Sequence, residues 1–166
     1  MEEYNEAIQV YEKAIELNPQ YYEAYNNLGV ALGKNEEYDE AIEAFKKALS
    51  INPDGFDTFY NMAVTLQDQN KLENAIEAYN NALSINPNDA DIYHNMGLAF
   101  KEQGKLEEAI EAFNKTLSLK PDFYEAYNNM GIILKYQGKL EEAIEAFNKS
   151  LLVKPDFYES YNNMGI

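Results

Sequence analysis

Side-chain amides are the groups in this chain best placed for recognition chemistry, because one asparagine recurs every 34 residues. An amide both donates and accepts hydrogen bonds, so it can bind the C=O and the N–H of a peptide backbone at once. Asparagine is also a poor residue for a helix interior, so its recurrence within predicted helices needs a reason. The row consists of Asn27, Asn61, Asn95, Asn129 and Asn163.

Two further rows accompany these asparagines, since residues three and four positions apart share one face of a helix. An acidic residue lies four positions earlier, at Glu23, Asp57, Asp91, Glu125 and Glu159. An aliphatic residue lies three positions later, at Val30, Val64, Leu98, Ile132 and Ile166. Two hypotheses stay open for the amides. We favour a ladder that holds an extended peptide, and the alternative is that the amides bond within each repeat and fix helix packing.

A ladder of this kind predicts weak, sequence-tolerant binding. Five amides that make two bonds each contribute roughly 5 to 15 kcal/mol, at about 0.5 to 1.5 kcal/mol per net bond. Ordering a peptide backbone costs about 1 to 2 kcal/mol per residue, which cancels much of that gain. Specificity must then come from side chains that differ between repeats, and the candidates are Tyr60, His94 and Tyr136.

The elements that position these rows follow from the prolines, which are Pro19, Pro53, Pro87, Pro121 and Pro155, again at intervals of 34 residues. A fixed period of this length is typical of a stacked repeat array. The period predicts full repeats at 22–55, 56–89, 90–123 and 124–157, with partial repeats at 1–21 and 158–166. Each half of a repeat has the apolar spacing of an amphipathic helix.

Small residues mark where the two helices of a repeat must approach closely, at Gly29, Ala63, Gly97 and Gly131. The turn between the helices contains Asn70, Gly104 and Gly138 at equivalent positions, and these residues tolerate a left-handed backbone. The first full repeat has Glu36 there, so we expect its turn to be altered.

These residues resemble the tetratricopeptide repeat over the whole chain. The series Tyr25, Leu28, Gly29 and Leu32, followed by Ala41, Phe45, Ala48 and Pro53, matches that family's signature. The resemblance implies an all-α, right-handed superhelix of antiparallel helix pairs whose concave face is lined by the first helices. Departures are mild, although the hydroxyls of Thr116 and Ser150 replace alanine and are expected to loosen packing.

The asparagine and acidic rows are similar to those of O-linked N-acetylglucosamine transferases, which implies an extended polypeptide as ligand. Co-chaperones with the same repeat grip an acidic carboxylate with Lys or Arg, whereas the row here is acidic. We therefore expect a basic or neutral peptide partner. The net charge of −16 argues against binding to nucleic acid or to an anionic membrane.

Catalysis is not expected, because no nucleophile, base and orienting group recur together. No glycine-rich phosphate loop, metal-ligand cluster or cofactor motif is present, and the chain has no cysteine. No basic segment followed by an apolar run precedes the first repeat, so we expect a cytoplasmic, soluble protein.

The two ends of the chain are out of phase with the repeat, so both are predicted to be open stacking faces. Such faces could join head to tail with a second copy. They also suggest a fragment of a longer protein. Three functions remain: a peptide-binding scaffold, the substrate-recruiting domain of a larger glycosyltransferase-type enzyme, and a self-assembling array.

Overall fold

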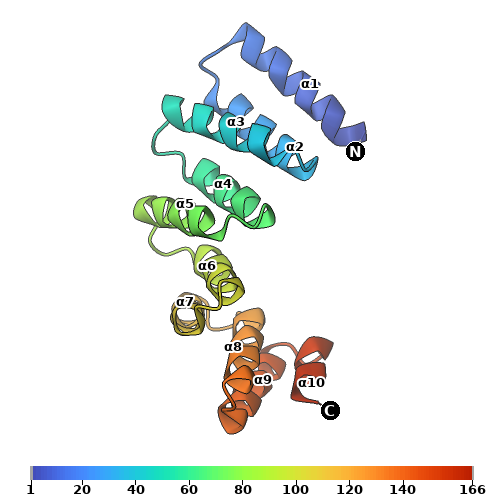
Figure 1. The fold of residues 1–166 in the computed structure, drawn as a ribbon, viewed down its shortest axis with the longest axis vertical. Coiled ribbons are helices and arrows are strands. Elements are labelled where there is room, and N and C mark those ends of the chain that lie inside the picture. The colour runs from blue at the N-terminus through green and yellow to red at the C-terminus, as the bar shows by residue number, and fades with distance from the viewer. Residues whose placement is uncertain (1, 166) are drawn as a thin grey trace. The chain divides into compact units, whose positions relative to one another are not determined.

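In a computed structural model, residues 2–165 are described and form ten α-helices with no strand among them (Figure 1). The expected all-α class is therefore confirmed. Met1 and Ile166, the last member of the aliphatic row, lie outside the described residues. The helices are α1 (Glu2–Leu17), α2 (Tyr22–Lys34), α3 (Tyr38–Ile51), α4 (Phe56–Asp68), α5 (Leu72–Ile85), α6 (Ala90–Glu102), α7 (Leu106–Leu119), α8 (Tyr124–Tyr136), α9 (Leu140–Val153) and α10 (Tyr158–Met164).

The chain divides into two compact units, residues 1–87 with α1 to α5 and residues 88–166 with α6 to α10. In the first unit α2 pairs with α3 and α4 with α5, while α2 also contacts α4 and α1 (Figure 1). In the second unit α6 pairs with α7 and α8 with α9, and α10 contacts both α8 and α9. We call the surface of α2 and α4, and that of α6, α8 and α10, the first-helix face of each unit.

In each of the four helix pairs, the second helix buries an aromatic ring against the first helix. Phe45 is fully buried among Leu32, Ala41 and Ala44, with Leu28 and Met62 packed around this cluster. Phe113 and Phe147 occupy the same place in the second unit and are also fully buried. Burying one such ring stabilises a fold by about 1.5 to 3 kcal/mol, so the amphipathic stripe read from the sequence is the source of the pairing.

The rings fit because the facing residue lacks a side chain. A Cβ atom built on Gly29 would lie 2.6 Å from Cε1 of Phe45, and Gly97 and Gly131 have the same separation from Phe113 and Phe147. The second full repeat differs, since Ala63 occupies the glycine position. Its ring partner is Tyr79, whose hydroxyl donates to Oε1 of Gln67 at 3.1 Å.

Gly97→Ala tests the ring contact. Overpacking a core costs about 1 to 3 kcal/mol, which exceeds the gain of up to about 1 kcal/mol from replacing glycine within a helix. Thermal unfolding followed by circular dichroism should therefore show a lower midpoint. A raised midpoint would mean that helix propensity outweighs the contact with Phe113.

The turns between paired helices share one left-handed residue. Glu36 has a φ of 65° and Asn70 a φ of 59°, beside values of 74° and 77° at Gly104 and Gly138. The following N–H bonds back to the helix in the same way, as Glu37 N does to Leu32 O at 2.9 Å. The expectation of an altered turn at Glu36 is therefore wrong. The packing of α2 against α3 imposes the left-handed conformation on a residue that does not favour it.

Glu36→Gly should raise the free energy of unfolding by about 1 kcal/mol, because left-handed backbone costs an L-residue roughly 1 to 2 kcal/mol. Chemical denaturation measures this gain. Glu37→Gly is the matched control, because Glu37 has a φ of −85° and gives no such relief. Equal effects at the two positions would show that Glu36 is not strained.

Candidate functional site

The first-helix face of the first unit contains a pocket of about 250 Å³ between α2 and α4. Asn61, Tyr60 and the aliphatic pair Val30 and Val64 all contribute to its wall. Four other residues complete the lining: Gly33, Lys34, Thr65 and Asp68. Members of the asparagine row and the aliphatic row, together with the specificity candidate Tyr60, thus line one pocket.

The amides of this unit are hydrogen-bonded to one another. Nδ2 of Asn61 donates to Oδ1 of Asn26 at 3.2 Å, and Nδ2 of Asn26 donates to Oδ1 of Asn27 at 3.3 Å. An asparagine offers two donors and two acceptor lone pairs. These bonds therefore use part of each amide and leave capacity for a ligand at Asn61, which is half-buried, and at Asn27, which is exposed.

The asparagines of the second unit are also bonded internally. Nδ2 of Asn129 donates to the backbone oxygen of Glu125 at 3.0 Å, and Oδ1 accepts from Nζ of Lys101 at 2.7 Å. Nδ2 of Asn163 donates to Oδ1 of Asn128 at 3.0 Å. Asn95 lies half-buried on α6. These contacts support a packing role for the row alongside any role in binding.

A buried polar cluster anchors Asn128, and the sequence reasoning missed it. Oγ of Ser160 lies 3.0 Å from Oδ1 of Asn128 and 3.0 Å from Oγ of Ser150. Both serines are fully buried. The hydroxyl of Thr116 is likewise satisfied, because it donates to the backbone oxygen of Ala112 at 3.1 Å. Since these hydroxyls have partners, they replace alanine without leaving a buried polar group unpaired.

Two lysines on the second unit's first-helix face were also missed. Lys101 reaches Asn129, and Nζ of Lys135 donates to the backbone oxygen of Asn163 at 2.6 Å. Burial lowers the pKa of Lys101. Both lysines occupy one repeat position, which is Gly33 in the first repeat and Gln67 in the second, so alignment of the repeats could have found them. They place positive charge beside asparagines that we had grouped with an acidic row.

The acidic row lies in the first turn of each first helix, at Glu23, Asp57, Asp91, Glu125 and Glu159. Carboxylates there interact favourably with the helix dipole, by about 0.3 to 1 kcal/mol each. Helix stability therefore accounts for part of this row. Contact with a ligand remains a prediction for these residues.

His94 is half-buried and packs against two aromatic rings. Its ring centroid is 4.6 Å from that of Phe123 and 5.6 Å from that of Phe113. Burial lowers the pKa of His94, while Glu125 and Asp91 raise it and Lys101 lowers it further. Its Nε2 atom is buried with no hydrogen-bond partner within residues 2–165. The neutral imidazole is therefore the form that fits.

Tyr136, the third specificity candidate, ends α8 and is 82% exposed. His94 of the same unit is half-buried between aromatic rings, so these two candidates differ in exposure, and Tyr60 belongs to the first unit. Residues 2–165 hold no group of three or more His, Cys, Asp or Glu arranged for a metal ion. No helix of this described part has the length and apolar character to cross a membrane.

A family model described as TPR repeat matches residues 1–36, 66–104 and 97–137, which is more than half of the chain. The chain belongs to the tetratricopeptide repeat family. Two models described as tetratricopeptide repeat match this TPR chain at residues 22–54 and 124–157, and at 44–77. Each of these models describes the repeat itself. A comparison with curated protein sequences found no match.

Solved TPR structures share the fold over nearly all of the chain. A crystal structure of MamA is 28% identical with a TM-score of 0.87, and covers 94% of this chain and 91% of that one. YrrB, described as a TPR protein with an unusual peptide-binding site, is 27% identical with a TM-score of 0.84, covering 99% and 85%. PilF of Pseudomonas aeruginosa is 27% identical with a TM-score of 0.74, covering 86% and 65%.

The half-buried His94 predicts a pH dependence for this TPR chain. The pKa of His94 in the folded state lies below its ordinary value of 6.5. Between the folded and the unfolded pKa the unfolded state binds more protons, so stability falls as the pH falls. NMR titration of this single histidine should give a midpoint below 6.5. His94→Asn, which introduces the residue found at Asn26 and Asn128, should remove this part of the pH dependence. A midpoint at or above 6.5 would contradict the buried neutral ring.

Proposed function

We propose that this chain is a protein-interaction scaffold that binds an extended peptide segment along its first-helix face. The observation that carries the proposal is the pocket between α2 and α4, where Asn61 and Tyr60 meet Val30 and Val64. An extended chain presents backbone amides and alternating side chains. The side-chain amide of Asn61 can hydrogen-bond to the backbone of the peptide, and the two valines can contact one of its apolar side chains.

Charge favours a neutral or basic ligand at the first unit. Asp68 lines the pocket, Asp57 and Glu23 are exposed on the same two helices, and Lys34 is the one lysine in the lining. The net charge of −16 also raises the encounter rate with a cationic partner. Lys101 and Lys135 modify this preference at the second unit, where an acidic side chain of the ligand could be accepted. A non-catalytic, cytoplasmic role fits this proposal.

Similarity supports a polypeptide ligand. YrrB is described as having a peptide-binding site, and its similarity covers 99% of this chain. We infer a polypeptide ligand for this chain from this similarity, at 27% identity. The substrate-recruiting domain of a glycosyltransferase-type enzyme stays a hypothesis, since it rests on the asparagine and acidic rows alone.

Self-assembly is a second candidate, favoured by apolar side chains exposed on α1 and α10. Val10 is 65% exposed, whereas Ala44 and Ala78 at its repeat position are 7% and 3% exposed. Tyr158 on α10 is 73% exposed. Docking α10 of one copy on α1 of another would cover both side chains.

Sedimentation velocity should show the mean mass rising with concentration, and Val10→Glu should abolish the rise. A monomer at high concentration would exclude this assembly.

The peptide-binding proposal is tested by the double variant Asn27→Ala with Asn61→Ala. Losing two amide contacts should weaken capture of a peptide selected on the chain from a random library by about tenfold, at 0.5 to 1.5 kcal/mol per bond. Fluorescence anisotropy measures the affinity. Asn80→Ala, an exposed asparagine on α5, is the matched control and should bind normally.

Thermal unfolding of the same variants separates binding from packing. Alanine favours a helix over asparagine by about 0.5 kcal/mol, which offsets part of the lost bond between Asn61 and Asn26. We expect a small change in midpoint together with the large loss of affinity. A lowered midpoint with unchanged affinity would assign the amides to packing and refute the ladder.

A further inference from the structure

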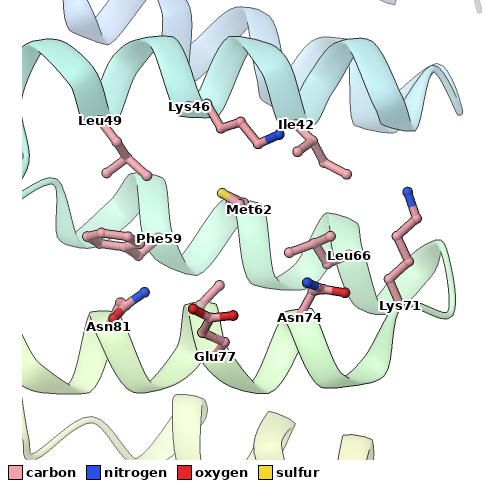
Figure 2. Close-up of a pocket in the computed structure, with 11 residues that line it drawn as sticks. Ile42, Lys46, Leu49, Phe59, Met62, Leu66, Lys71, Asn74, Glu77 and Asn81 are labelled. Atoms are coloured by element: carbon pink, nitrogen blue, oxygen red, sulfur yellow. The ribbon is translucent and has the colours of Figure 1, made fainter.

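A second pocket, of about 350 Å³, lies on the other side of α4, between α3 and α5 (Figure 2). Phe59, Met62 and Leu66 of α4 form its floor, and Ile42 and Leu49 of α3 line one wall. The pocket between α2 and α4 uses a different side of α4, through Tyr60, Asn61, Val64, Thr65 and Asp68. The two pockets therefore present separate surfaces of the first unit.

The other wall, on α5, departs from the repeat at two positions. Asn74 stands where the other three full repeats have a glutamate, at Glu40, Glu108 and Glu142. Asn81 stands where they have a lysine, at Lys47, Lys115 and Lys149. Both asparagines are exposed, so the changes are not needed to fill the core. They replace charge with neutral hydrogen-bonding groups on the wall of this pocket alone.

Glu77, which lies between the two asparagines on α5, differs from two of its counterparts, which are paired with a lysine. Glu43 pairs with Lys46 at 2.7 Å, and Glu145 pairs with Lys149 at 2.7 Å. On α5 the residues three and four positions after Glu77 are both asparagine.

The two lysines that line the pocket are already engaged. Lys46 is bound to Glu43, and Lys71 lies 3.1 Å from Asp39. Within residues 2–165, Glu77 forms no ion pair with a Lys or His at 4.0 Å or less. An unpaired carboxylate thus borders a groove whose floor is apolar (Figure 2).

We infer that this groove is a second binding site, for an extended polypeptide segment that carries one Lys or Arg between apolar side chains. Asn74 and Asn81 are seven residues apart on one helix, which is about 10.5 Å at 1.5 Å per residue. Three residues of extended chain span about 10 Å. The two amides therefore bind the backbone, Glu77 binds the cation, and Met62 with its neighbours receives the apolar side chains.

The experiment uses the full chain with ¹³C-labelled methionine methyl groups. Met62 forms the floor of this groove, and Met130 occupies the same repeat position in the second unit, where Glu145 is paired. The probes are two capped nonapeptides of alternating threonine and aliphatic residues, one with a central lysine and one with a central glutamate. The lysine peptide should shift the Met62 signal in a saturable way and leave the Met130 signal unmoved.

Two variants sharpen the test. Asn81→Lys restores the residue of the other repeats and supplies an internal partner for Glu77, so it should weaken binding of the lysine peptide about three- to fivefold, as should Glu77→Gln. Asn114→Lys adds the same charge on α7 and should leave the affinity measured at the Met62 signal unchanged. An unmoved Met62 signal, equal shifts with the glutamate peptide, or equal shifts at Met130 would overturn the proposal.

Discussion

The contact between a buried ring and a residue without a bulky side chain is the constraint on which the rest of the structure depends. Gly29, Gly97 and Gly131 let the two helices of a pair close until the ring fills the space of a missing Cβ. This close contact fixes how each first helix is rotated about its axis, and therefore which of its residues face outward. Asn61 and Val64 reach one side of α4, and Met62 reaches the other, because Ala63 between them is held at the interface, fully buried.

The second full repeat has a different pair at these positions, Ala63 and Tyr79, and it departs from the other full repeats at Asn74 and Asn81 as well. Tyr60 lies with its ring centroid 6.3 Å from that of Tyr79. Asn74 and Asn81 change the α5 wall on the far side. In an array of nearly identical units, residues found in one repeat alone distinguish its surface from those of its neighbours. Two pockets with different chemistry border this repeat.

Much of the fold could be predicted from the sequence, because the 34-residue period reports the helix pairs, their apolar stripes and the small residues at the interface. Helix periodicity also predicted that Asn61 lies on the same face as Val30 and Val64. Helix periodicity did not predict that Asn61 bonds to Asn26 or that Asn163 bonds to Asn128. Each partner belongs to the preceding repeat, and only the packing of the helices brings it within hydrogen-bonding distance. The turn at Glu36 was predicted wrongly, because helix pairing outweighs a local cost of about 1 kcal/mol. The groove between α3 and α5 depends on the spacing of two helices that no single repeat specifies.

We propose that the asparagine amides of the first-helix face do more than hold the helices together. They bind a peptide with the hydrogen-bonding capacity that packing leaves unused. NMR of the side-chain NH₂ groups in the chain with a library-selected peptide tests it most directly. The signals of Asn27 and Asn61 should shift on binding, and their protons should exchange more slowly with water, while the signal of Asn80 on α5 should not change. Saturable binding that leaves the Asn27 and Asn61 signals unmoved would contradict it.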